Sequence, residues 1–316
     1  MRMLVTGGAG FIGSTLVDRL LAEGHEVDVI DDLSTGRLAN LAEARTTGRL
    51  RFHQVDIRSD DTVTLIERRA PSVVFHLAAQ ADVRVSVERP GFDAAINVLG
   101  SINVLEGARR AGAARVVAAA SGGTLYGEPP DEDIPTRESV PHRPLSPYGV
   151  SKKSMIDYMV AYRELHSLEF AALALGNVYG PRQDPHGEAG VVSIFAERLL
   201  RDEPVTIFGS GEQTRDFVFV DDVVDAFVRA ASRSGGLVIN IGTGRELSVN
   251  ELYRVMAAAA GSSTAATFAD ARPGELSRSC LDVERAAMQL EWRSWTSIDD
   301  GVRATIDFVR TQLAQA

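Results

Sequence analysis

The sequence predicts an α/β fold with a doubly wound parallel sheet, followed by a smaller C-terminal region that interleaves with it. In the first half of the 316 residues, short apolar runs alternate with longer amphipathic runs, which is the pattern of repeated strand–helix units. The short runs are almost continuously apolar, as expected for strands that are covered on both faces. This regularity weakens after Pro181, which predicts a second kind of organisation there.

The apolar runs predict six strands and the amphipathic runs predict four helices. The strands are expected at Met3–Thr6, Glu26–Ile30, Arg51–Val55, Ser72–Phe75, Arg115–Ala119 and Glu169–Leu175. The helices are expected at Ile12–Ala22, Asp60–Arg69, Phe92–Ala111 and Tyr148–His166. Right-handed crossovers place helices on both faces of such a sheet, and ligands bind at the carboxyl ends of its strands.

The C-terminal half predicts a smaller region that binds a ligand. GPRQDPHGEAG is a polar loop rich in Pro and Gly, too long for a simple connection, and is expected to face the ligand. Shorter helix and strand patterns follow, among them VTIFG and LVINIGTG. We therefore expect residues 1–176 to form the larger domain, with segments of about 215–245 returning to it, and residues 177–316 to form most of the smaller one.

Composition excludes several classes of function. A formal charge of −10 argues against nucleic acid or an anionic membrane as the main partner. The single cysteine, Cys280, cannot form an intramolecular disulfide and fits a reducing cytosol. The opening MRMLVTGG is already a strand, which leaves no room for a secretion signal, and no apolar run is long enough for a membrane span. We expect a cytoplasmic protein, and the spacing of the six histidines predicts no metal site.

The stretch VTGGAGFIG predicts a dinucleotide-binding turn between the first strand and the first helix. Gly7, Gly10 and Gly13 have the spacing that lets a diphosphate approach the N–H groups at a helix N-terminus. The second strand is followed by Asp31, where a carboxylate binds a ribose diol and repels a 2′-phosphate. The pattern predicts a Rossmann-like domain that binds NAD rather than NADP, although Arg37 lies nearby.

Residues that follow the later strands complete the predicted cofactor site. VDIR fits an adenine contact, and HLAAQ offers small side chains beside the cofactor. Asn97, on the next helix, is placed to order that wall. Beyond the glycines and Asp31, the predicted cofactor contacts are Phe11, Ile12, Asp56, Ile57, Leu77, Ala78, Ala79, Gln80 and Asn97.

The stretch SPYGVSKKS predicts a catalytic pair. Tyr148 and Lys152 are four residues apart in a helical run and therefore share a face. A free tyrosine has a pKa of about 10, and a neighbouring ammonium lowers that pKa toward the range of a useful base. We expect Tyr148 as the catalytic base and Lys152 as the group that tunes it, both also contacting the cofactor. A surface helix that happens to carry this pair is the alternative interpretation.

These motifs, together with NVYGPRQ and RDFVFVDD, make the sequence similar to the extended short-chain dehydrogenase/reductase family. Within that family it most resembles the NAD-dependent nucleotide-sugar 4-epimerases, from Met3 to about Phe308. The resemblance implies NAD as cofactor and a UDP-hexose, UDP-glucose or UDP-galactose, as substrate. It also implies a homodimer formed through the helix pair predicted at Phe92–Ala111 and Tyr148–His166.

The same resemblance implies a mechanism and a set of substrate contacts. Tyr148 takes the proton of the sugar 4-hydroxyl while C4 gives its hydride to NAD, and the hydride then returns to the other face of a 4-keto sugar. The residues implied to bind the substrate, besides Tyr148, are Asn177, Arg215, Arg272 and Glu275.

The stretch SGGTLYG departs from this resemblance. The position four residues before Tyr126 is Ser or Thr in the epimerases and is Gly122 here. Dehydratases and decarboxylases carry acids in the next two positions, which are Gly123 and Thr124 here, so elimination of water is disfavoured. If the strand stays extended, Thr124 projects as a side chain at Gly122 would. We expect Thr124 as the catalytic hydroxyl, Ser121 as the second candidate and a water as the third.

The exact substrate stays open. The residue at the family's gate position is Ser279, whose small side chain implies room for a 2-N-acetyl group. UDP-N-acetylhexosamine and UDP-hexuronate 4-epimerases are therefore alternatives, as is a net reductase of a nucleotide-sugar ketone. A non-catalytic NAD-binding regulator is the alternative from another class, and the presence of both Tyr148 and Lys152 argues against it.

Overall fold

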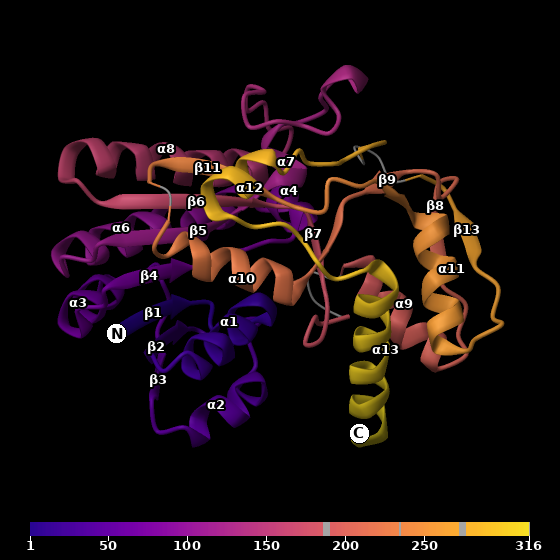
Figure 1. The fold of residues 1–316 in the computed structure, drawn as a ribbon, viewed down its shortest axis with the longest axis horizontal. Helices are drawn as coiled ribbons and strands as arrows, with labels where there is room; N and C mark the ends of the chain where they lie inside the picture. The colour runs from indigo at the N-terminus through magenta and orange to yellow at the C-terminus, as the bar shows by residue number, and fades with distance from the viewer. Residues whose placement is uncertain (186–189, 234, 272–275, 316) are drawn as a thin grey trace.

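A parallel seven-stranded sheet forms the centre of the protein. The computed structural model describes residues 1–185, 190–233, 235–271 and 276–315. The strands lie in the order β11-β6-β5-β4-β1-β2-β3 (Figure 1). They are β1 (Arg2–Thr6), β2 (Glu26–Asp31), β3 (Leu50–Gln54), β4 (Val73–His76), β5 (Arg115–Ser121), β6 (Glu169–Leu175) and β11 (Leu237–Ile241). The doubly wound sheet expected from the sequence is confirmed, with β11 added beside β6.

Helices cover both faces of this sheet. On one face, α1 (Phe11–Ala22) packs against α10 (Val220–Ala230) and α2 (Ala42–Thr46). On the other face, α6 (Ser101–Arg110) lies between α3 (Asp60–Arg69) and α8 (Pro147–His166). Alternate residues of each strand enter two separate hydrophobic cores, one per face, as the period of a buried strand requires.

The helix expected at Phe92–Ala111 is interrupted by a π-helical turn. It consists of α5 (Pro90–Ala94), the π turn η2 (Ala95–Gly100) and then α6. A π turn adds a residue to one turn and changes the direction of the side chains around it, and such turns are frequent at functional sites. A Cβ at Gly100 would lie 2.6 Å from Ile57 Cδ1, so the absence of a side chain lets this turn pack closely on the segment after β3.

The C-terminal half adds three small sheets and a group of helices beside the main sheet (Figure 1). The strand pairs are β7 (Asn177–Tyr179) with β10 (Phe217–Phe219), β9 (Thr214–Arg215) with β12 (Leu247–Ser248), and β8 (Thr206–Phe208) with β13 (Thr267–Ala269). The helices α9 (Val191–Leu200), α11 (Val249–Ala260) and α13 (Ile298–Gln315) pack against one another. The remaining elements are η1 (Leu38–Leu41), α4 (Val83–Glu88), α7 (Gly122–Leu125), η3 (Asp131–Asp133) and α12 (Glu284–Leu290).

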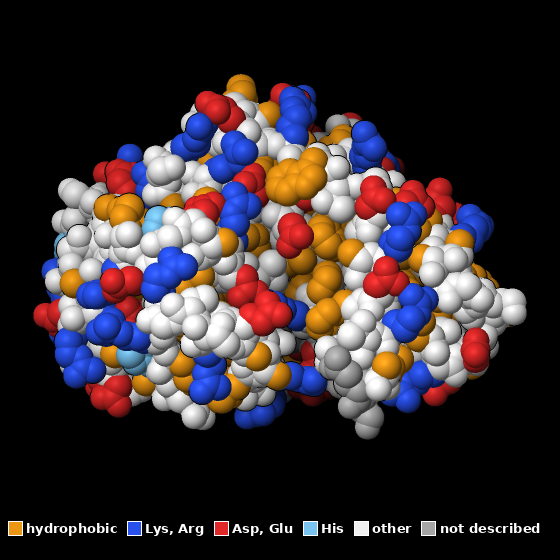
Figure 2. Space-filling model, turned by 60° about the horizontal axis from the view of Figure 1, so that its bottom comes forward, with side chains coloured by type: hydrophobic (Ala, Val, Ile, Leu, Met, Phe, Trp, Pro, Cys, Tyr) orange, Lys and Arg blue, Asp and Glu red, His pale blue; other side chains and the backbone are white. Residues whose placement is uncertain are grey.

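The surface carries acidic and basic side chains side by side, as Figure 2 shows for one face. Within the described ranges, no helix is both long enough and apolar enough to cross a membrane. The division into a larger and a smaller domain stays a prediction, although β11 does return from the C-terminal half to the main sheet.

Candidate active site

The glycine-rich turn after β1 packs too tightly to accept side chains. Gly7 has a φ of +70°, and a Cβ on it would lie 2.6 Å from the backbone nitrogen of Ala78. A Cβ on Gly13 would lie 2.0 Å from the carbonyl oxygen of Gly7. These glycines therefore bring the start of α1 against the turn and against the segment that follows β4.

The N-terminus of α1 has the features of a diphosphate site. Gly10 is the N-cap residue, and no side chain caps the helix there. The first N–H groups of a helix have no partner inside the helix, and together they attract an anion. Phe11 and Ile12 form the first turn behind Gly10. The uncapped helix end, reached over glycines, fits the diphosphate of a dinucleotide.

The carboxylate of Asp31 is held rigidly beside this turn. Its Oδ2 accepts the N–H of Ala9 and its Oδ1 accepts the N–H of Leu33, both at 2.9 Å. Burial raises the pKa of Asp31, and the two backbone hydrogen bonds counteract the rise. The position at the carboxyl end of β2 and the fixed geometry fit the recognition of a ribose diol.

Two ion pairs tie the loop after β7 to the cofactor end of the sheet. Arg37 pairs with Asp184 at 2.5 Å, and Arg182 pairs with Asp18 of α1 at 2.7 Å. The guanidinium of Arg37, the cation noted beside the predicted NAD site, is therefore engaged by a carboxylate. This arrangement agrees with NAD rather than NADP as the predicted cofactor.

The predicted adenine contacts have different surroundings. The Asp56 carboxylate binds Arg58, and that hydrogen bond lowers the pKa of Asp56. Ile57 is buried, with its side chain against Gly100 of the π turn. The contact of both residues with adenine stays a prediction, and for Ile57 it would have to use the backbone rather than the buried side chain.

The segment Leu77–Gln80 forms a wall that is joined to the π turn. Leu77 N–H donates to Thr6 O at 3.1 Å, which places the segment, including Ala78 and Ala79, at the carboxyl end of β1. Gln80 N–H donates to Asn97 Oδ1 at 2.9 Å, and Asn97 Nδ2 donates to Gln80 O at 2.8 Å. This reciprocal pair fixes the backbone at Gln80.

Tyr148 and Lys152 lie together in the first turns of α8. The Tyr148 N–H donates to Ser86 Oγ at 3.1 Å, and Lys152 Nζ donates to the carbonyl of Ala119 in β5 at 3.0 Å. The Lys152 ammonium lies 5.8 Å from the centroid of the Tyr148 ring. Both residues are buried, 9% and 4% exposed, so the ammonium acts on the phenol with little screening by water.

His76 lies beneath this pair as a neutral, fully bonded group. Its Nδ1 is 2.8 Å from Thr6 Oγ1 and its Nε2 is 2.9 Å from Ser101 Oγ. Burial, and then the charge of Lys152, lowers the pKa of His76 to about 3. At neutral pH, His76 therefore adds no second cation beside Lys152.

The stretch at the end of β5 differs from its expected form. The strand ends at Ser121, and α7 begins at Gly122, so the premise of an extended strand through Thr124 is wrong. From Gly122 on, the side chains follow the helical turn of α7 and no longer alternate between the two faces of the sheet, so Thr124 does not project as a side chain at Gly122 would in a strand. A Cβ on Gly122 would lie 2.5 Å from Leu281 Cδ1, so packed protein rather than water fills that space.

The two candidate hydroxyls have unlike surroundings. Thr124 Oγ1 is buried and has no hydrogen-bond partner in the structure. A Cβ on Gly149 would lie 3.3 Å from Thr124 Cβ, so Thr124 packs against the residue that follows Tyr148. Ser121 is half-buried at the carboxyl end of β5. Both stay predictions as catalytic residues.

The predicted substrate contacts lie around the buried carboxylate of Asp216. Asn177 is exposed at the start of β7, and its N–H donates to Asp216 O at 2.7 Å. Arg215, the preceding residue, is half-buried on β9. The Asp216 carboxylate accepts Thr243 N–H at 2.7 Å and Leu281 N–H at 3.2 Å, so it joins the segments around the site. The predicted contacts at Arg272 and Glu275 lie outside the described residues.

A narrow pocket opens beside α7. Its lining comes mainly from two segments, the glycine-containing stretch at the end of β5 and the segment after residue 275. The lining residues are Gly122, Gly123, Tyr126, Gly127, Pro129, Thr136, Leu276, Arg278, Ser279, Cys280 and Leu281. Arg278 is bound by Glu246 at 2.6 Å and by Asp131 at 2.7 Å. Burial raises the pKa of the Cys280 thiol to about 12, which keeps it neutral.

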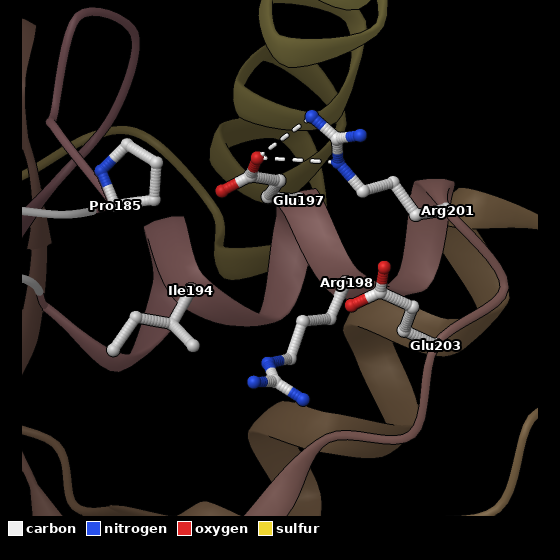
Figure 3. A pocket seen from close by; sticks show the side chains of 6 residues that line it. All are labelled: Pro185, Ile194, Glu197, Arg198, Arg201 and Glu203. Carbon is white, nitrogen blue, oxygen red and sulfur yellow. Dashed lines mark hydrogen bonds and ion pairs between the residues drawn. The ribbon is translucent and has the colours of Figure 1, made fainter.

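A second hollow, of about 360 Å³, lies on α9 and contains none of the predicted site residues (Figure 3). It is lined by Pro185, Ile194, Glu197, Arg198, Arg201 and Glu203, and Figure 3 shows Glu197 bonded to Arg201 within it. In the described residues, no group of three or more His, Cys, Asp or Glu side chains is arranged to hold a metal ion.

Sequence reasoning missed two buried groups next to the catalytic pair. Asp93 and Ser151 are buried and hydrogen-bonded to each other at 2.9 Å, and Asn97 donates to Asp93 at 2.7 Å. Asp93 and Asn97 are four residues apart, a spacing that predicts a contact between them on one face of a helix. Ser151 directly precedes Lys152, which places it next to the catalytic pair in the sequence.

The chain is similar to known proteins along nearly its whole length. The profile of the NAD-dependent epimerase/dehydratase family matches residues 3–242. UDP-glucose 4-epimerase of Mycolicibacterium smegmatis is 49% identical over 99% of both chains. The structure of UDP-glucose 4-epimerase from Thermotoga maritima with UDP-glucose has a TM-score of 0.95 at 40% identity, covering 99% of this chain and 100% of that one. The Thermus thermophilus enzyme with NAD has a TM-score of 0.91 at 42% identity, covering 98% and 99%.

Proposed function

The chain belongs to the NAD-dependent epimerase/dehydratase family, and on that premise we propose that it epimerises C4 of a UDP-hexose, interconverting UDP-glucose and UDP-galactose. The observation that carries the proposal is the buried pair of Tyr148 and Lys152 on α8, whose lysine binds Ala119 near the carboxyl end of β5 in the same parallel sheet whose β1 and β2 bear the glycine turn and Asp31. A base and a cofactor site at one sheet edge provide what reversible oxidation of an alcohol requires.

The residues of this chain perform the proton transfers. Lys152 stabilises the phenolate of Tyr148, and that phenolate accepts the proton of the sugar 4-hydroxyl. The glycine turn, the N-terminus of α1 and Asp31 would hold NAD, which would supply a hydride acceptor for C4 and then a hydride donor to the other face of the sugar. Tyr148 gives its proton back to O4, so the protein ends each cycle in its starting protonation state.

Arg278, the one charged side chain among the described residues that line the narrow pocket, is already engaged by two carboxylates, which favours a neutral sugar over a hexuronate. Arg278 is shared between Glu246 and Asp131, so this cluster already holds more carboxylates than cations. Burial raises the pKa of Tyr126, whose hydroxyl binds Asn240, and that phenol stays neutral. An added sugar carboxylate would meet a cluster of net negative charge, which repels it.

One observation favours an N-acetylhexosamine as a second substrate. Gly123 and Ser279, two of the smallest residues, both line the narrow pocket. A Cβ on Gly123 would lie 3.9 Å from Ser279 Oγ, which is van der Waals contact, so the room for a 2-N-acetyl group lies beside Ser279 rather than between these two residues. We therefore propose that UDP-N-acetylglucosamine and UDP-N-acetylgalactosamine are also interconverted, more slowly than the unsubstituted sugars.

We further propose that the enzyme is a cytoplasmic homodimer. Leu99 of the π turn and Val150 and Tyr158 of α8 are 59%, 51% and 41% exposed, respectively, on elements that contact each other. Exposed apolar side chains on neighbouring helices support a face that a second copy covers. Light scattering is expected to give twice the chain mass for the wild type and a monomer for Leu99→Arg; a monomeric wild type contradicts the dimer.

A panel of UDP-sugars with analysis of the products tests the proposed substrate class. UDP-galactose and UDP-glucose are expected to interconvert fastest, the N-acetyl pair more slowly, and UDP-glucuronate not measurably. Turnover of UDP-glucuronate alone would overturn the assignment to neutral sugars. Binding of NAD with no conversion of any UDP-sugar would instead support a non-catalytic regulator.

A further inference from the structure

We propose that Asp93 is a positioning residue that fixes both walls of the nicotinamide pocket, α8 on one side and the segment Leu77–Gln80 on the other. The kinetic part of this inference rests on the proposed function. The geometric part rests on a buried network that neither the cofactor motif nor the catalytic pair includes.

Asp93 lies where α5 meets the π turn and has no exposed surface. Its Oδ1 accepts from Ser151 Oγ at 2.9 Å, and its Oδ2 accepts from Asn97 Nδ2 at 2.7 Å. Ser151 Oγ also lies 2.9 Å from the carbonyl oxygen of Tyr148. One carboxylate therefore touches the residue between Tyr148 and Lys152 on α8 and the residue that holds Gln80.

A carboxylate accepts in both contacts, whereas an asparagine in its place accepts in only one of them and donates in the other. An ionised Asp has acceptors and no donor, so it requires Asn97 to turn its amide nitrogen toward it. With the nitrogen fixed in this way, Asn97 Oδ1 accepts Gln80 N–H at 2.9 Å. An amide at position 93 would have to bring its own N–H groups against Ser151 or Asn97. The orientation of Asn97, and with it the wall at Gln80, therefore depends on Asp93.

The surroundings of Asp93 also act on the charge of its carboxylate. Burial raises the pKa of Asp93, while the hydrogen bonds from Ser151 and Asn97 and the charge of Lys152 counteract that rise. The charge of Lys152 lowers the pKa of Asp93, so the buried ammonium and the buried carboxylate attract each other. Ser151, which binds Asp93, is the residue next to Lys152 in α8. Asp93 thus supports the catalytic pair without touching the substrate.

The test compares Asp93→Asn with Asp222→Asn. Asp222 is also fully buried, and it accepts from Trp295 N–H and Thr296 N–H, which are not part of the proposed pocket. Both variants remove a buried charge, so both are expected to lower the melting temperature. Only Asp93→Asn is expected to lower kcat for UDP-galactose, by about tenfold or more with KM within about twofold, because the reacting groups are misplaced rather than lost.

Two further readouts separate positioning from general destabilisation. The kinetic isotope effect with UDP-galactose deuterated at C4 is expected to rise in Asp93→Asn, because loosening slows the hydride step itself. The fluorescence anisotropy of NADH loaded into the protein is expected to fall in Asp93→Asn and not in Asp222→Asn. This second readout needs no turnover, so it still tests Asp93 if the wild type converts no UDP-sugar and the proposed function fails.

If Asp93→Asn does not fold, Ser151→Ala is the variant that tests the same contact. It removes the bond from Asp93 to α8 and keeps the charge, and we expect a lower kcat and a higher isotope effect with the NADH anisotropy less affected. The proposal is overturned if Asp93→Asn, or Ser151→Ala in its place, behaves like Asp222→Asn in kcat, isotope effect and anisotropy.

Discussion

The side chain of Leu281 occupies the space into which a side chain at Gly122 would extend. A Cβ on Gly122 would lie 2.5 Å from Leu281 Cδ1 and 3.1 Å from Leu175 O. Leu281 is buried and its N–H is held by Asp216 at 3.2 Å, so it has little room to move away. The side chain of Leu281 therefore occupies the space that a serine or threonine at position 122 would need.

The substitution Gly122→Ser is expected to destabilise the protein. Forcing extra atoms into this packed position costs about 1–3 kcal/mol of unfolding free energy, measured by urea denaturation. The double variant Gly122→Ser with Leu281→Ala is expected to be more stable than the sum of the two single changes, because the alanine makes room. Strict additivity of the two changes would contradict a direct contact.

A comparison of Thr124→Val with Ser121→Ala tests which hydroxyl serves Tyr148. Thr124 Oγ1 is buried without a partner, so Val at this position is expected to leave stability unchanged or raise it. If Thr124 bridges the substrate O4 and Tyr148, the same variant loses about 10²-fold or more in kcat. Near-normal kcat in Thr124→Val, with a large loss in Ser121→Ala, would reverse the assignment.

The substitution Ser279→Tyr is expected to narrow the substrate range. A tyrosine ring at position 279 would extend into the narrow pocket beside Gly123, into the space that we assign to the 2-N-acetyl group. Turnover of UDP-N-acetylgalactosamine is expected to fall at least about tenfold more than that of UDP-galactose, the size of change that a filled pocket gives. Ser279→Ala is the matched control, and equal losses for both sugars in Ser279→Tyr would contradict a gate at this position.

His76 is expected to make the protein less stable in acid. Its pKa of about 3 in the folded protein lies below its ordinary value of 6.5, so the unfolded chain takes up this proton first as the pH falls. Its contribution to stability is complete above pH 6.5 and is lost between there and about pH 3, with a slope of about 1.4 kcal/mol per pH unit.

His76→Asn therefore should flatten the pH dependence of the unfolding free energy over this range. His166→Asn is the control, because His166 is an exposed histidine on α8, outside the buried core. Equal slopes in the wild type and His76→Asn would show that His76 does not stay neutral in the folded protein.

The centre of the main sheet was predictable because β1, β4, β5 and β6 are mainly buried apolar runs, and the α1 turn was predictable because its glycines have a fixed spacing. Alternation along β5 could not predict the path after Ser121, since successive glycines allow the chain to enter α7 there. The relation between Gly122 and Leu281 joins residues far apart in the sequence, and only the fold brings them together. The role that we propose for Asp93 likewise depends on the π turn, which the helical pattern did not predict.

The central claim is that Tyr148 and Lys152 serve a reversible oxidation at C4. The most direct measurement incubates purified wild type and Tyr148→Phe with UDP-galactose, with no NAD added, and follows the formation of UDP-glucose. We predict product from the wild type at many turnovers per chain, and a loss of about 10²-fold or more in the phenylalanine variant, because the base is gone. Equal rates in the two proteins, or conversion only when NAD is consumed in proportion to substrate, would contradict the account.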